Sequence, residues 1–378
     1  MFETSIGNNI FFNGQCLIVD SNIAKDDEIY YAAPTGERSA ALAEYGYNEL
    51  CLMLDSMYGL KEVHEIDSFD QLFDRIGFKH FLLEKDAKTA DKMVYLTINK
   101  YLDDIHSAFV AYSYLTGSID DKVESGPSRA SLLEHRNEHI QARAAQYPDG
   151  VPAYEEVGNT AYITFDNFNL SSTTLADYYD IKSVDDLPID GSDTLALVIW
   201  AHAQITREDS PIENVVIDLS CNTGGAVDTA AYLVAWCLGK ASISLKDTFT
   251  GAMANTDYWA DVNLDHVFDE KDTIADKNIY CLISPVSFSC GNLVPNVFKQ
   301  SGKVTLLGRT SGGGSCIVLT ASTAWGTSFN ISAPRRMSFL KNGSLYDIDR
   351  GADPDYTIST PEKYYDRQAL TDYINTLY

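Results

Sequence analysis

The sequence is poor in basic residues. Its 378 residues include 28 Lys and Arg against 54 Asp and Glu, which gives a formal net charge of −26 at pH 7. A surface this acidic repels the phosphate backbone of nucleic acids and the anionic surface of membranes. We therefore expect neither nucleic acid nor a membrane to be a partner of this chain.

Long apolar runs are missing as well. No stretch reaches the roughly 20 apolar residues that a transmembrane helix needs. The opening residues, MFETSIGN, lack the basic and apolar regions of a signal peptide. If a signal peptide has been removed ahead of this start, we expect the protein to act outside the cytoplasm, as a secreted or cell-surface protein.

Motifs for metal ions and disulfides are also lacking. The seven cysteines show no CxxC spacing, and no HExxH motif occurs. We expect mostly buried, reduced cysteines and no metal or organic cofactor. His135 and His139 lie four residues apart and could share a metal ion, but the charged residues around them favour a solvated helix face.

Hydrophobic patterning divides the chain into three parts. Residues 1–116 form a mainly helical region that follows a short hairpin around Asn13-Gly14. Residues 117–155 are polar and are predicted to be a linker with one helix. Residues 156–378 alternate strands with helices, which predicts an α/β core of repeated strand–turn–helix units.

Individual elements can be predicted in both halves. In the first part we predict three helices: one that ends at Gly59, one at residues 67–76 and one at residues 89–105. In the core the predicted strands are 161–165, 215–219, 279–283 and 304–308, and the predicted helices are 193–205, 228–238 and a segment ending at Gln300.

Three segments carry groups that could perform chemistry. DLSCNTGG, at 218–225, ends a buried strand in paired glycines before a helix, so backbone N–H groups there could bind an oxyanion. SFSCG, at 287–291, places a small nucleophile between a strand and a helix, as in a nucleophile elbow. LDDIHSAF, at 102–109, carries one histidine at a helix end. Each segment also has an ordinary structural explanation. The paired glycines could form a tight turn, the serines could cap a helix, and the histidine could interact with the dipole at a helix end.

In this order, the segments resemble those of peptidase family S41, the C-terminal-processing serine peptidases and their tricorn-like relatives. Members carry an Asp-Leu-Arg-x-Asn-x-Gly-Gly turn, which is matched at 216–225 with Ser220 where arginine is usual. Four other family motifs match 102–107, 287–290, 308–315 and 351–355.

The resemblance implies a serine peptidase with assigned roles. Ser289 would be the nucleophile, and His106 would be the general base of the tricorn-like branch. The N–H groups of Gly224 or Gly225 and of Cys290 would hold the oxyanion. The substrate would be a peptide or protein.

The sequence departs from the family at the groups that activate the serine. The tail-specific branch uses a lysine, and Gly314 stands at that position. The tricorn-like branch has a serine before its histidine, where this chain has Ile105. The acid that orients the histidine is expected just before 351–355. We prefer Asp349 to Asp347, and the two would share a face if their segment were a strand.

The resemblance also implies a ClpP/crotonase-like core with an N-terminal helical region and no PDZ domain, because the linker is too short for one. Two other functions stay open. A catalytically inactive relative that binds peptides in the same cleft is favoured by Ile105, Ser220 and the missing lysine. An acyl-CoA enzyme of the crotonase kind would need more basic groups than this chain offers.

Overall fold

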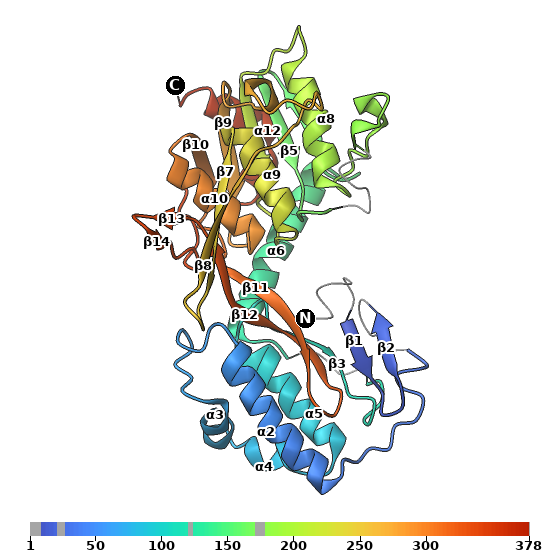
Figure 1. The fold of residues 1–378 in the computed structure, drawn as a ribbon. Helices are drawn as coiled ribbons and strands as arrows, with labels where there is room; N and C mark the ends of the chain where they lie inside the picture. Colours follow the sequence, from blue (N-terminus) through green and yellow to red (C-terminus); the bar gives the residue numbers. More distant parts are fainter. Residues whose placement is uncertain (1–8, 21–26, 120–123, 171–177, 378) are drawn as a thin grey trace. The chain divides into compact units, whose positions relative to one another are not determined.

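The computed structural model describes residues 9–20, 27–119, 124–170 and 178–377 (Figure 1). The chain forms two compact units. The first comprises residues 1–131, 247–252 and 316–336, and the second comprises 132–246, 253–315 and 337–378. Within the described ranges, no helix combines the length and the apolar character that crossing a membrane requires.

The first unit packs helices against a small antiparallel sheet. Its helices are α2 (Ala40–Met57), α3 (Phe69–Arg75), α4 (Lys79–Leu82) and α5 (Ala87–Leu96), which continues as a π-helical turn (Thr97–Tyr101). Its strands are β3 (Ala108–Ala111), β11 (Cys316–Ser322), β12 (Ser328–Ser338) and a separate hairpin, β1 (Asn9–Phe12) with β2 (Leu17–Asp20). Both β3 and β11 pair antiparallel with β12. Trp325, Phe329 and Ile331 belong to one buried cluster with apolar residues of α2, α3 and α5.

Asp91 of α5 ties these helices to the β11–β12 hairpin. Its buried carboxylate accepts hydrogen bonds from the Ser113 N–H (2.9 Å) and hydroxyl (2.8 Å), from Trp325 Nε1 (2.7 Å) and from the Thr327 hydroxyl. Burial raises the pKa of Asp91, although hydrogen bonds from Thr327, Thr116 and Ser113 act against the rise. One side chain therefore holds together three segments that are distant in sequence.

The second unit is built on a six-stranded sheet in the order β15-β10-β9-β6-β5-β4. Every neighbouring pair is parallel except β4 with β5. The strands are β4 (Tyr154–Val157), β5 (Thr160–Thr164), β6 (Asn214–Asp218), β9 (Asn278–Ile283), β10 (Val304–Gly308) and β15 (Tyr356–Thr357). Every residue of β5 and β6 is buried, as expected for central parallel strands covered on both faces.

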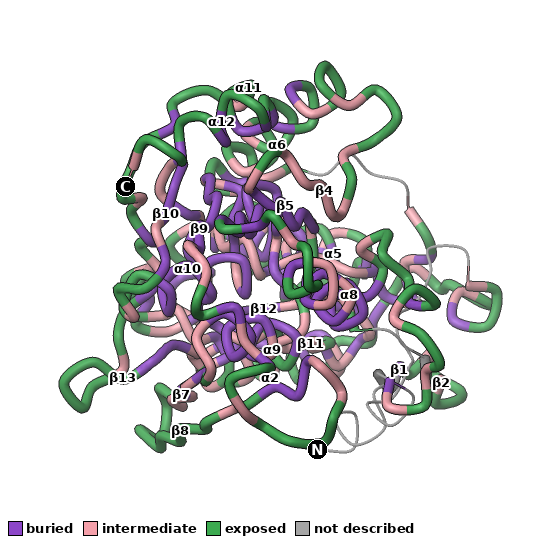
Figure 2. The backbone as a smooth tube through the Cα atoms, turned by 90° about the horizontal axis from the view of Figure 1, so that it is seen from above, coloured by how far each residue is buried: buried purple, intermediate pink, exposed green. Residues whose placement is uncertain are grey.

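Helices cover both faces of this sheet (Figure 1). One face carries α8 (Thr194–Thr206), α9 (Val227–Leu238) and α10 (Cys290–Ser301), and the other carries α6 (Pro127–Gln146), α11 (Glu362–Tyr365) and α12 (Arg367–Ile374). Figure 2 shows β5, β9, α9 and α10 as largely buried. The remaining elements are the hairpins β7 (Ala241–Asp247) with β8 (Met253–Tyr258) and β13 (Leu340–Lys341) with β14 (Ser344–Leu345), and two 3₁₀ turns, Val184–Asp186 and Glu270–Asp272.

The predicted core elements are confirmed to within about two residues, and the chain has the mixed α/β fold that its alternation of elements indicates. The predicted hairpin at Asn13-Gly14 is confirmed, and six of the seven free cysteines are buried, Cys16 being the exposed one. The predicted helix 89–105 is too long. It ends at Tyr101, and Asp103 takes a φ of +46°, which no helix allows.

Asp91→Ala is expected to lower the free energy of unfolding by about 3 kcal/mol or more, because several buried donors lose their acceptor together. Urea unfolding of the full chain measures this change. Asp74→Ala, an exposed position on α3, is the control and should have little effect. Equal losses in the two variants would contradict the role of Asp91.

Candidate active site

Ser289 lies in the turn between β9 and α10, at the carboxyl end of a parallel strand. It adopts φ 56° and ψ −122°, a conformation that costs a residue other than glycine about 1–3 kcal/mol. Its N–H donates to the Gly313 carbonyl (2.9 Å), and its own carbonyl accepts from the Leu293 N–H (2.8 Å). The side chain is partly exposed. This is the geometry of a nucleophile elbow, in which a strained turn holds a nucleophile at a strand–helix junction.

Glycines allow a second turn to approach this elbow. A Cβ at Gly224, whose φ is +107°, would lie 2.6 Å from the Ser289 Cβ and 3.0 Å from its Oγ. A Cβ at Gly291 would lie 2.4 Å from the Asn222 carbonyl oxygen. No side chain fits in either gap, so the paired-glycine turn packs directly against the candidate nucleophile.

Two backbone donors near Ser289 are available to an anion. The Gly224 N–H is already used, because it donates to Asn222 Oδ1 (2.9 Å). The N–H groups of Gly225 and Cys290 have no acceptor among the described residues. Cys290 is the first residue of α10, where a helix leaves its N–H groups unpaired.

Two buried serines join the elbow to the turn after β6. The Ser287 hydroxyl donates to the Leu219 carbonyl (2.7 Å) and accepts from the Ser284 N–H (2.9 Å). The Ser284 hydroxyl donates to the Ser220 carbonyl. Because all these groups are buried, each missing bond would leave an unsatisfied polar atom, and the two turns are held in register.

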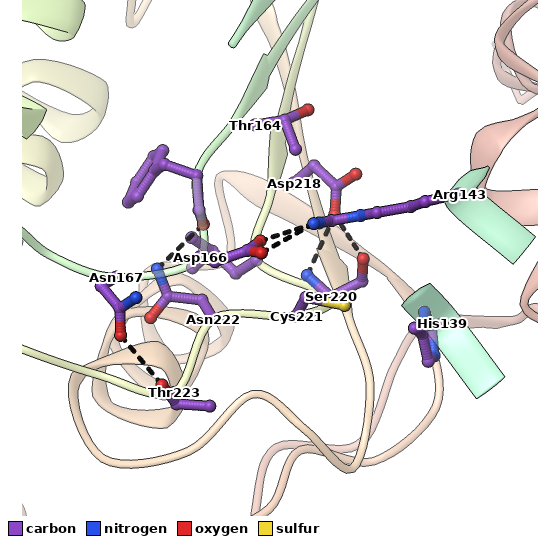
Figure 3. A network of polar contacts seen from close by, with 12 residues as sticks. His139, Arg143, Thr164, Asp166, Asn167, Asp218, Ser220, Cys221, Asn222 and Thr223 are labelled. Atoms are coloured by element: carbon purple, nitrogen blue, oxygen red, sulfur yellow. Dashed lines mark hydrogen bonds and ion pairs between the residues drawn. The ribbon is translucent and has the colours of Figure 1, made fainter. Parts of the chain in front are cut away.

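A network of ion pairs and hydrogen bonds, buried around Asp218 and partly exposed at Asp166, lies next to the turn after β6 (Figure 3). Asp218 pairs with Arg367 of α12 (2.6 Å) and accepts from the Ser220 hydroxyl (2.6 Å). Burial would raise the pKa of Asp218, but Arg367 and Arg143 outweigh it and hold that pKa below its ordinary value. Arg143 of α6 donates from Nη1 to both carboxylate oxygens of Asp166 (2.7 and 2.8 Å).

This network reaches the paired-glycine turn through Thr223. The Thr223 N–H donates to the Asp166 carbonyl (2.9 Å), and its hydroxyl donates to Asn167 Oδ1 (2.9 Å; Figure 3). The turn is therefore bonded to the segment that follows β5, where the Asp166 side chain in turn binds Arg143 of α6.

The glycine-rich turn after β10 excludes a lysine at Gly314. Its φ is +90°, and a Cβ there would lie 2.6 Å from the ring of Phe288. Any side chain at this position would displace the ring beside the elbow. The structure thus gives a physical reason for the absence of lysine that the sequence shows.

Asp349 lies in the same unit as the elbow. Its Oδ1 accepts from the Ser315 N–H (2.6 Å), and its N–H donates to Asp347 Oδ1 (3.1 Å). The segment 346–351 is a loop with a turn, not a strand, so the condition under which alternation would place both acids on one face is not met. The Asp347 side chain instead folds back onto the backbone of Asp349.

His106 belongs to the first unit and follows the π-helical turn rather than ending a helix. Its N–H donates to Asp104 Oδ1 (3.1 Å), and Arg129 donates to the carbonyls of Ile105 (2.7 Å) and Ser107 (2.8 Å). These bonds fix the backbone around the histidine. Ser289, Gly224, Gly225, Cys290 and Asp349 are together in the second unit, so the pairing of His106 with Ser289 stays a prediction.

His139 is not on a solvated face. It is fully buried, its Nδ1 lies 2.7 Å from the Tyr365 hydroxyl, and burial lowers its pKa to about 4. That prediction is wrong because α6 packs this side against α11. His135 is partly exposed and contacts Glu138 (3.1 Å).

Sequence reasoning missed several residues that build the site. Asn292, one helical turn after Ser289, donates to the Ile348 carbonyl (2.9 Å) and accepts from the Ser311 hydroxyl (2.7 Å). A polar residue within the buried face of a helix is a signal that could have identified it. The partners of Asp218 have a weaker signal, namely that an aspartate in an apolar strand needs a buried cation.

The fold and this arrangement define an α/β protein with a nucleophile elbow beside a paired-glycine turn. The model of peptidase family S41 matches residues 159–358, which is more than half of the chain. The chain belongs to peptidase family S41. None of the curated proteins compared with the chain matches it.

Solved structures that match with TM-scores above 0.5 share the fold. A protein from Parabacteroides merdae ATCC 43184 described as a peptidase is 15% identical with a TM-score of 0.56, over 90% of this chain and 97% of that one. Mature CPAF in complex with lactacystin is 10% identical with a TM-score of 0.54, over 89% of this chain and 97% of that one. The photosystem II D1 C-terminal processing protease is 16% identical with a TM-score of 0.36, and the match spans 54% of this chain and only 42% of that one.

Gly314→Ala is expected to lower the free energy of unfolding by about 1–3 kcal/mol more than Gly302→Ala. Both glycines have positive φ, but only a methyl group at Gly314 meets the Phe288 ring, because nothing lies within 4 Å at Gly302. Chemical denaturation of the two variants separates the clash from backbone strain. Equal losses would show that the turn has room for a side chain.

Proposed function

We propose that this protein is a serine peptidase that hydrolyses peptide bonds through Ser289. The observation that carries the proposal is the strained elbow of Ser289, with the paired-glycine turn against it and two unpaired N–H groups beside it. Membership of a peptidase family makes a peptide or protein the substrate and favours this chemistry over that of an acyl-CoA enzyme.

The reaction would follow the acyl-enzyme route. Ser289 Oγ attacks the scissile carbonyl carbon while His106 takes its proton, and His106 then protonates the leaving amine. Water, activated by the same histidine, hydrolyses the ester. The N–H groups of Gly225 and Cys290 hold the oxyanion, and we prefer Gly225 to Gly224 because the Gly224 N–H is occupied by Asn222.

Serine rather than the adjacent cysteine is the proposed nucleophile. Burial raises the pKa of the Cys290 thiol to about 12, and the thiol donates to the Gly225 carbonyl (3.2 Å). A thiol of this kind is not a thiolate near neutral pH and does not attack a carbonyl. Ser289, in contrast, is partly exposed.

His106 is the proposed base because no lysine fits at Gly314 and because the segment around the histidine matches the tricorn-like branch. Asp349 is the proposed acid that orients the imidazole, with Asp347 as the alternative. No cofactor is part of the proposed mechanism.

The proposal includes an organisation of the chain. Residues 1–116 form the helical region that supplies His106, 117–155 are a linker with a helix, and 156–378 are a ClpP/crotonase-like catalytic core without a PDZ domain. The six-stranded sheet with helices on both faces supports such a core. We expect no nucleic-acid partner, because the chain is strongly acidic.

A fluorophosphonate probe tests whether the serine is activated. We expect the wild type to be labelled and Ser289→Ala to be unlabelled. His106→Ala should lower peptide hydrolysis by at least about 100-fold. The double variant should be little worse than either single one, because the two residues act as a unit.

His80→Ala, an exposed position on α4, is the control and should keep full activity. A wild type that hydrolyses no peptide and reacts with no probe would instead identify a catalytically inactive relative that binds peptides. Full activity of His106→Ala would refute the base.

Asp349→Asn should lower kcat/KM for peptide hydrolysis by at least about tenfold, because an amide cannot stabilise the imidazolium. The melting temperature should change little, since the amide oxygen can still accept from the Ser315 N–H. Asp347→Asn is the matched comparison. A loss in that variant alone would move the role to Asp347, and no loss in either would remove the acid from the mechanism.

A further inference from the structure

The loop between β8 and β9 spaces its oxygen-bearing side chains like a calcium-binding loop. The twelve residues 261–272 read DVNLDHVFDEKD. Loops of the EF-hand type take ligands from positions 1, 3, 5, 9 and 12 and from the backbone carbonyl of position 7. In this chain positions 1, 3, 5, 9 and 12 are Asp261, Asn263, Asp265, Asp269 and Asp272.

The backbone of the loop already follows that pattern. His266, at position 6, has a φ of +64°, the conformation for which calcium loops use glycine. Its N–H donates to Asp261 Oδ2 (2.9 Å). The N–H of Asp265 donates to Asn263 Oδ1 (2.9 Å), and the N–H of Val267 donates to Asp265 Oδ1 (2.9 Å). The side chains at positions 1, 3 and 5 thus each accept a hydrogen bond from a backbone N–H group of the loop.

An independent feature supports a cation site in this loop. Asp261 is only 5% exposed and Asp272 only 2%. Asp261 Oδ1 has no hydrogen-bond partner in the described part of the chain, and the ion pairs found there in this segment involve only Asp269 and Asp276. The other carboxylate oxygen, Asp261 Oδ2, accepts from the Tyr179 hydroxyl (2.9 Å) and from the His266 N–H (2.9 Å), both of which are uncharged donors.

Buried carboxylates without a cation are unfavourable, and in proteins they are normally paired or bind a metal. The two carboxylate oxygens of Asp272 accept hydrogen bonds from the backbone N–H groups of Val262, Asn263 and Asp269. Those bonds lower the cost of burial but supply no positive charge. A divalent cation in the loop would supply it.

We propose that residues 261–272 bind one calcium ion. Among the described residues no three acidic, histidine or cysteine side chains are yet arranged to hold a metal, so binding must turn the exposed Asp265 and the partly exposed Asp269 inward. Calcium fits better than magnesium, because calcium accepts irregular coordination by six to eight oxygens, whereas magnesium demands a near-ideal octahedron.

The ion would stiffen the connection from β8 to β9. The loop is attached to α9 by two bonds, from the Tyr232 hydroxyl to the Asp261 carbonyl (3.0 Å) and from the Ile274 N–H to the Trp236 carbonyl (3.1 Å). The position of the loop beside α9 would therefore depend on calcium. The proposal does not depend on the peptidase chemistry.

Titration calorimetry of the full, metal-free chain with calcium chloride tests the site. We expect one ion per chain with a Kd of about 10⁻⁴–10⁻³ M, the weak end of such loops, because position 12 is aspartate rather than glutamate. Asp265→Asn removes one charged ligand but keeps an amide oxygen for the Val267 N–H. It should weaken binding at least about tenfold.

Asp276→Asn is the matched control, because Asp276 lies just outside the loop with a side chain that is 71% exposed. It should bind calcium like the wild type, and calcium should raise the melting temperature of both by more than that of Asp265→Asn. Absence of binding to the wild type would overturn the site. Equal weakening in the two variants would also overturn it, since it would show diffuse binding to an acidic surface. These readouts need no peptidase activity, so a failure of Ser289 labelling leaves them unchanged.

Discussion

The close approach of two backbone turns, at the carboxyl ends of β6 and β9, is the constraint on which the rest of the site depends. Gly224 and Gly291 lie where any Cβ would collide with the opposite turn, and buried serine hydroxyls bridge the remaining distance. This packing holds Ser289 in a conformation that it would not keep alone. The backbone strain at Ser289 is thus offset by the packing of the two turns and by the hydrogen bonds of the buried serines.

Buried charge is handled in two different ways in the second unit. Asp218 pairs directly with Arg367 of α12, and the charge of Arg143 of α6 also favours its ionised form. The chain has only 28 basic residues, so few arginines are available to neutralise buried carboxylates. The loop between β8 and β9 buries Asp261 and Asp272 with no ion pair to either carboxylate among the described residues, which is the basis of the proposed cation site.

Apolar patterning predicts the parallel core well and the antiparallel strands poorly. Strands β5, β6, β9 and β10 are buried on both faces and appear in the sequence as short apolar runs. Strands β7, β8 and β11 are partly or largely exposed, so their residues are mixed and give no clear period. The charged residues around His139 concealed a fully buried imidazole, because the partner that buries it, Tyr365, is far away in the sequence.

The sequence alone was sufficient to place the elbow at Ser289, the paired glycines at Gly224 and Gly225, and the family, because these depend on spacings within a few residues. The tertiary structure decided what those residues do to one another. It shows that the Gly224 N–H is occupied, that Gly314 has no room for a side chain, and that Asp347 and Asp349 lie on a loop. Such facts are set by hydrogen bonds and contacts between segments many residues apart, and no local pattern encodes them.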